Sequence, residues 1–81
     1  MSRDKILSEL NKIISDVTFS DTIISESSKA DDVEGWDSLA HINIILAIEK
    51  FYNITFSTSD MLGMANVKEL IDIIVKKINV Q

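Results

Sequence analysis

The segment from Gly35 to Leu39, with the sequence GWDSL, holds the residue types in this chain best suited to chemistry. Aspartate favours the N-cap of a helix, and we expect the Asp37 carboxylate to accept the amide proton of Leu39 or Ala40. Ser38 would then be the first helical residue, with its hydroxyl facing solvent above unpaired amides. Those amides and the helix dipole favour a phosphate ester on this oxygen. The pattern suits a serine that carries a phosphodiester; the alternative is an Asp-Ser pair that only caps a helix.

His41 follows Ser38 by one helical turn, which raises the possibility of a hydrolase built on Ser38, His41 and Asp37. We disfavour this class because the chain has no glycine-rich oxyanion loop and its 81 residues leave little room for a substrate pocket. A solvated histidine, or one that contacts the phosphate of such an ester, is expected instead.

Acidic residues are concentrated between positions 16 and 37, where there are seven of them against one lysine in a chain of net charge −5. This balance disfavours nucleic-acid binding and favours basic protein partners. Asp31, Asp32 and Glu34 lack calcium-loop spacing, and with one histidine and no cysteine no metal site is expected. No apolar run is long enough to span a membrane. We expect a cytoplasmic monomer.

Periodic apolar residues predict three amphipathic helices and one short helix. Their expected ranges are Ser2 or Arg3 to Asp16, Asp37 to Tyr52, Ser59 to Met64, and Val67 to about Asn79. Ser2 and Asn66 are expected N-caps. The prediction is an all-α fold, a small four-helix bundle that forms a single domain over residues 1–81.

A long loop from Phe19 to Trp36 separates the first two helices. We expect it to be ordered, because Ile23, Ile24 and Val33 can pin it to the core. Loops of this length are often functional in compact domains. The alternative is a disordered linker.

The helix from Asp37 to Tyr52 has two apolar stripes, whereas a surface helix needs only one. The second stripe is therefore either buried by another helix or offered to a partner. We expect the exposed stripe to consist of Leu39, Ile42 and Leu46. We expect the other stripe to form the core, with Ile44, Ile45, Ile48, Phe51 and Tyr52.

These features together resemble the acyl carrier protein family over nearly the whole chain. Asp37-Ser38-Leu39 matches the family's attachment motif at the start of the second helix. From Gly35 to Ile78 the pattern fits without a gap. The matching apolar and capping positions are Ile42, Ile44, Ile45, Leu46, Ile48, Phe56, Asn66, Val67, Leu70, Ile71 and Ile74.

The resemblance implies a non-catalytic carrier. A phosphopantetheinyl transferase would move 4′-phosphopantetheine from coenzyme A onto Ser38, between Asp37 and Leu39, and the terminal thiol would carry an acyl group as a thioester. Implied partners are acyl-loading and acyl-processing enzymes such as a synthetase, a ketosynthase or an acyltransferase. The residues implied for docking are Trp36, Leu39, Ile42, Leu46 and Glu49. The alternatives are an aminoacyl or peptidyl carrier, and a helical interaction module without a prosthetic group.

The chain departs from the fatty-acid members of the family along its second helix. Ala40, Asn43 and Lys50 stand where those members often have acids, and Glu49 is the one acid that remains. Trp36 is bulkier than the small residue common before their aspartate. These departures favour a specialised carrier of a polyketide, polysaccharide or other pathway. Trp36 itself is expected either to plug the core or to contact a partner.

Overall fold

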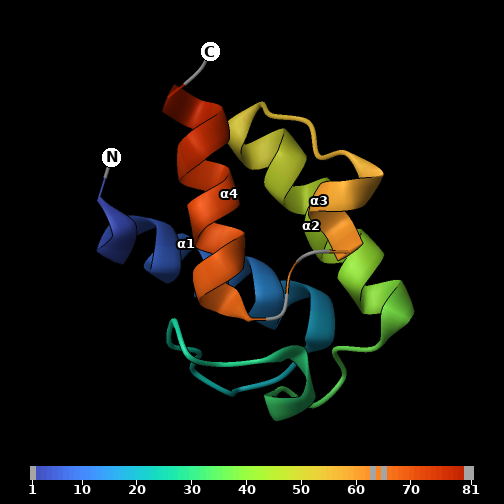
Figure 1. Cartoon of the computed structure of the whole chain (residues 1–81). Coiled ribbons are helices and arrows are strands. Elements are labelled where there is room, and N and C mark those ends of the chain that lie inside the picture. The colour runs from blue at the N-terminus through green and yellow to red at the C-terminus, as the bar shows by residue number, and fades with distance from the viewer. Residues whose placement is uncertain (1, 63, 65, 80–81) are drawn as a thin grey trace.

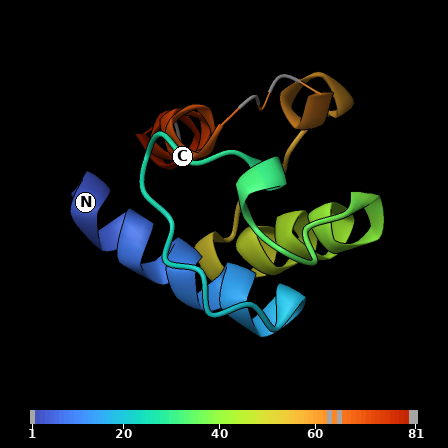
Figure 2. The ribbon, with the colours of Figure 1, turned by 90° about the horizontal axis from the view of Figure 1, so that it is seen from below.

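The computed structural model describes residues 2–62, 64 and 66–79. Its helices are α1 (Arg3–Thr18), α2 (Ser38–Tyr52), α3 (Thr58–Leu62) and α4 (Val67–Asn79), with a short 3-10 helix, η1 (Ala30–Asp32), before α2. The described part of the chain contains no strand, which confirms the all-α, four-helix prediction. α1 packs against both α2 and α4 (Figure 1). In the perpendicular view α1 and α2 lie in one layer, with α4 and α3 above them (Figure 2).

The core is formed by one face from each of the three long helices. It is closed by apolar residues from the two longer connections. The buried residues are Ile6, Leu10 and Ile14 of α1; Ala40, Ile44, Ile45 and Ile48 of α2; Val67, Leu70, Ile71 and Ile74 of α4; and Ile24, Val33, Ile54 and Phe56 of the connections.

Side-chain caps fix where the long helices begin. The Ser2 hydroxyl accepts the amide of Lys5 at 3.2 Å, and the Asn66 side chain accepts the amide of Glu69 at 2.9 Å. Both expected caps are confirmed. α1 runs two residues past the expected end at Asp16, and it is capped by Phe19, which adopts a left-handed conformation and whose amide donates to the Ser15 carbonyl at 2.8 Å.

The long loop is ordered, but one of its expected anchors is wrong. Ile24 and Val33 are buried, whereas Ile23 is 85% exposed. The reason is Asn11 of α1, whose side chain accepts the amide of Ile24 at 2.8 Å and donates to its carbonyl at 3.3 Å. This pairing turns Ile24 inward, and adjacent side chains of an extended segment point to opposite sides. Ile23 therefore faces solvent.

The same loop supplies hydrogen bonds to the start of α4. The amide of Val67 donates to the Ser28 carbonyl at 2.9 Å, and the amide of Lys68 donates to the Glu26 carbonyl at 2.8 Å. These are amides of the first turn, which have no partner within their own helix. The loop therefore spans from α1 to α4 before it returns to α2.

The buried face of α2 ends before its last turn. Phe51 is 57% exposed, so its expected place in the core is wrong, although the helical period aligns it with Ile44. At this end of α2 the contact with α1 is made by Tyr52, whose hydroxyl donates to the Glu9 carboxylate at 2.6 Å. Burial, and then this carboxylate, raise the pKa of the Tyr52 phenol.

α3 is short and is held by polar contacts. It begins one residue before the expected Ser59 and is described up to Leu62. The expected end at Met64 is wrong, because Met64 is not helical; position 63 of the expected range lies outside the described residues. Ser57 and Asp60 cap each other across its first turn, at 3.0 and 3.1 Å. The Asp60 carboxylate also pairs with Lys77 of α4 at 2.9 Å, so α3 is tied to α4.

Candidate functional site

Ser38 is the first residue of α2 and is exposed to solvent. As expected from the sequence, the Asp37 carboxylate accepts the amide of Ala40, at 2.8 Å. The amides of Ser38 and Leu39 have no hydrogen-bond partner among the described residues. An exposed hydroxyl therefore lies beside two free N–H groups at the positive end of a helix. This arrangement favours a negatively charged ester on the Ser38 oxygen.

The backbone turn into this site depends on Gly35. Its φ is +86°, in the region that favours glycine, and a Cβ there would lie 2.9 Å from the carbonyl oxygen of Thr18. The close approach lets the loop pass over the end of α1 and enter α2 at Asp37.

Trp36 and His41 form a pair beside Ser38. The indole Nε1–H of Trp36 donates to Nδ1 of His41 at 3.1 Å. Their ring centroids are 6.0 Å apart and the ring planes differ by 23°. Both residues are half-buried, and Trp36 packs against the core. The structure thus agrees with the core plug as one expected role of Trp36, and gives His41 a protein partner that the sequence did not indicate.

A groove of about 550 Å³ opens next to the Ser38 hydroxyl. It runs between α2, η1 and α3. Its walls combine apolar side chains with two carboxylates and contain no lysine or arginine. The lining residues are Ala30, Asp31, Trp36, Asp37, Ser38, His41, Ile42, Met61 and Leu62.

Sequence reasoning missed the contribution of η1 and α3 to this groove. Met61 and Leu62 are distant from Ser38 along the chain and carry no motif. The fold places them beside the start of α2. No local pattern could have indicated them.

The expected exposed stripe of α2 is present on the surface. Leu39 is 68% exposed, Ile42 is 47% exposed and Leu46 is 52% exposed. Ile42 also lines the groove beside Ser38, whereas Leu46 does not. The stripe therefore begins at the attachment candidate and continues along the helix away from it.

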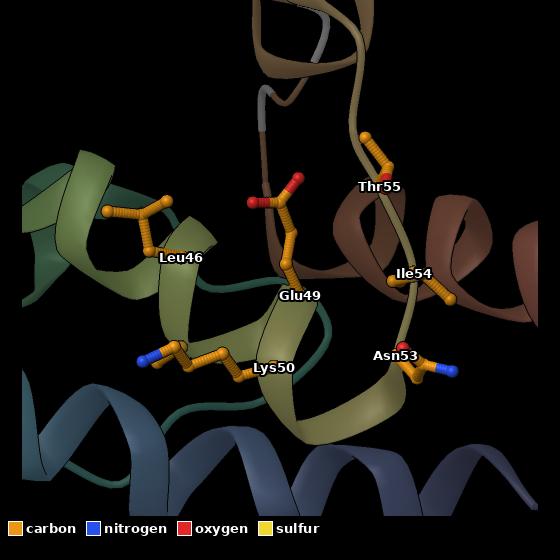
Figure 3. A pocket seen from close by; sticks show the side chains of 7 residues that line it. Leu46, Glu49, Lys50, Asn53, Ile54 and Thr55 are labelled. Atoms are coloured by element: carbon orange, nitrogen blue, oxygen red, sulfur yellow. The ribbon is translucent and has the colours of Figure 1, made fainter.

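A second hollow, of about 660 Å³, lies at the other end of α2 (Figure 3). Leu46 and Glu49 line it together with the chain that follows the helix. The Glu49 carboxylate accepts the amide of Phe56 at 2.8 Å, so this acid holds the returning chain against α2. Glu49 and Ser38 are about 16 Å apart along the helix axis, at 1.5 Å per residue. The structure does not bring these two residues together.

Two further classes of site have no support in the described residues. They contain no group of histidine, cysteine and acidic side chains that could hold a metal ion. None of the helices among residues 2–62, 64 and 66–79 is long and apolar enough to cross a membrane.

Comparison with known proteins gives consistent matches. Residues 5–74 match the family described as "Phosphopantetheine attachment site". An acyl carrier protein of Cyanidium caldarium is 30% identical over 81 residues, covering 98% of this chain and 93% of that protein. One from Coprothermobacter proteolyticus is 32% identical over 76 residues, covering 91% and 92%. The solution structure of a holo acyl carrier protein from Geobacter metallireducens is similar with a TM-score of 0.83, at 31% identity, covering 91% of this chain and 86% of that chain.

Proposed function

Since this chain belongs to the acyl carrier protein family, whose prosthetic group is phosphopantetheine, we propose that Ser38 is the residue to which that group is attached. The observation that supports Ser38 is its exposed hydroxyl beside the two free amides at the start of α2. Asp37 caps the helix and Leu39 follows on the exposed stripe. The site fits a phosphodiester, because its negative charge would lie at the positive end of the helix.

The attachment is a transfer from coenzyme A, carried out by a phosphopantetheinyl transferase. The Ser38 oxygen bonds to the phosphorus that carries pantetheine, and the pyrophosphate bond of coenzyme A breaks. Adenosine 3′,5′-bisphosphate leaves, and the hydroxyl proton goes to a base of the transferase. When bound, the group supplies a thiol for thioester formation, which this cysteine-free chain lacks.

The experiment is an intact-mass measurement on the apo protein after incubation with coenzyme A, magnesium and a broad-specificity transferase. The parent should gain one phosphopantetheinyl group, and Ser38→Ala should gain none. Ser59→Ala is the matched control, because Ser59 is also an exposed serine of a helix, and it should load like the parent. Loading of Ser38→Ala would refute the assignment. If the folded parent also stayed unloaded with its cognate transferase, a helical interaction module would replace this proposal.

The loaded protein would present acyl intermediates as thioesters to other enzymes without catalysing a reaction itself. We place the contact with acyl-loading and acyl-processing enzymes on the exposed stripe of Leu39, Ile42 and Leu46. Trp36 and Glu49 flank this surface, although both side chains also make contacts within the protein. A specialised pathway fits better than housekeeping fatty-acid synthesis, because Glu49 is the one acid on α2. A single domain that works as a cytoplasmic monomer completes the proposal.

A direct test of the stripe uses holo protein and an acyl-loading enzyme. Changing Leu46 to Ala should lower kcat/KM for loading, mainly through KM, because apolar contact area with the enzyme is lost. Asn43→Ala, at another exposed position of α2, is the control and should load at the parental rate. Equal kcat/KM values for both variants and the parent would remove Leu46 from the docking surface.

A further inference from the structure

We propose that His41 binds the phosphodiester on Ser38 through its Nε2–H, and that Trp36 is the residue that positions it. This inference rests on Ser38 as the attachment site. It assigns to the Trp36–His41 pair a role that the carrier function alone does not require.

The hydrogen bond from Trp36 determines which nitrogen of His41 carries the proton. An indole N–H can only donate, so Nδ1 of His41 must accept at 3.1 Å. In a neutral imidazole the proton is then on Nε2. Trp36 therefore leaves His41 with one N–H donor, on the edge of the ring away from the indole.

His41 lies one helical turn after Ser38 on α2, so its side chain can reach the Ser38 end of the helix. Helical side chains lean toward the N-terminus, and residues three apart are neighbours on one face. The contact with Trp36, which precedes the helix, shows that the imidazole reaches back over the first turn. His41 and Ser38 also line the same groove.

A phosphate in this groove would need hydrogen-bond donors, and the side chains that line the groove offer few. No lysine or arginine lines it, and the carboxylates of Asp31 and Asp37 do. Trp36 and His41 carry the side-chain N–H groups of the described lining residues, and the Nε1–H of Trp36 already donates to His41. No described residue accepts the Nε2–H of His41. His41 thus holds the free side-chain donor closest in sequence to Ser38, and complements the amides of Ser38 and Leu39.

The test is nuclear magnetic resonance on apo and holo protein, with intact mass confirming the loading of each sample. The chain has one histidine and one tryptophan, so their side-chain signals need no separate assignment. In both forms the ¹⁵N shifts should show a proton on Nε2. On loading, the Nε2–H resonance should move downfield and its exchange with water should slow. An Nε2–H signal that is identical in apo and holo protein would overturn the proposal.

Two substitutions separate binding of the phosphate from packing against Trp36. His41→Gln places an amide near the Nε2 position, whereas His41→Asn keeps an acceptor near Nδ1 for Trp36. The ³¹P resonance of holo His41→Gln should stay near the parental value, and that of holo His41→Asn should shift. Trp36→Phe should yield a mixture of His41 tautomers and a weaker downfield shift on loading. Asn43→Ala is the control and should match the parent throughout.

The outcomes distinguish this inference from the proposed function. If the folded parent fails to load even with its cognate transferase, the proposed function is refuted, and the role of His41 falls with it. If all variants load but share one ³¹P shift, only the role of His41 is refuted. Should His41→Asn not fold, the comparison of apo and holo parent still decides the question.

Discussion

Replacing the Ser38 side chain should not lower the stability of the fold, because this side chain does not help to hold the fold together. Its hydroxyl makes no hydrogen bond with the described residues, and Asp37 next to it caps the helix. We expect Ser38→Ala to alter the free energy of unfolding by no more than about 0.5 kcal/mol, as for other exposed positions. Asp37→Ala should cost about 1 kcal/mol through the lost cap. Urea denaturation measures both, and a larger loss for Ser38→Ala than for Asp37→Ala would contradict this account.

At Gly35 the fold requires a backbone conformation that favours glycine. Gly35→Ala should lower the free energy of unfolding by at least about 1–2 kcal/mol, because a left-handed conformation is unfavourable for residues with a Cβ. The new Cβ would also lie 2.9 Å from the Thr18 carbonyl oxygen. Glu34→Ala, at the exposed neighbouring position, should have little effect. Equal thermal midpoints for the two variants would show that the loop can relax.

At the scale of elements, α2 has a buried face and an exposed apolar stripe. Ile48 is fully buried and Leu46 is half-exposed, two residues earlier. Ile48→Ala should lose about 2–5 kcal/mol because it leaves a cavity. Leu46→Ala should remain within about 0.5–1 kcal/mol, since much of its side chain is already in water. Chemical denaturation of both variants checks this, and a native-like Ile48→Ala would mean that the faces are assigned the wrong way round.

The anchoring of α3 should depend on pH through Asp60. The Ser57 amide and then Lys77 lower the pKa of the Asp60 carboxyl to about 2. Because the pKa in the folded protein is below the ordinary value of about 3.8, the contribution of Asp60 to stability is complete above that value and is lost as the pH falls toward 2. Amide shifts of α3 should therefore stay constant from pH 7 to about 4 and change below it. In Asp60→Asn the Ser57 amide shift should lose this acid transition; its persistence would assign the transition to another group.

How much of this structure could be predicted depends on how local each cause is. The caps at Ser2 and Asp37 act within one helical turn, so the sequence shows them. Ile24 is buried while Ile23 is exposed, because Ile24 makes a hydrogen bond with Asn11 of α1. No local pattern contains a contact between two elements. Phe51 follows the helical period of the core, but that period cannot show where the covering elements stop. The partnership of His41 with Trp36 likewise depends on how the loop enters α2.

At the scale of the whole molecule, Arg3 joins three segments that are far apart in the sequence. Its guanidinium contacts Glu26 of the long loop and Asp72 of α4, the latter at 2.7 Å. The hydrogen bond from Arg3, and then one from Lys68, lower the pKa of the Asp72 carboxyl. The beginning of the chain is thereby tied both to the loop that leads to the attachment candidate and to the last helix.

This connection should be visible in hydrogen exchange. Arg3→Gln removes the charge that holds Glu26, whose carbonyl accepts the amide of Lys68 at 2.8 Å. The amides of Val67 and Lys68 should then exchange faster, because the loop can separate from α4 without unfolding the core. The amide of Ile48, deep in α2, should keep its parental rate. Lys12→Gln breaks a pair between two highly exposed side chains and should change none of these rates. Faster exchange at Ile48 as well would mean that Arg3 supports the whole bundle, whereas unchanged rates at Val67 and Lys68 would show that the backbone bonds alone hold the loop.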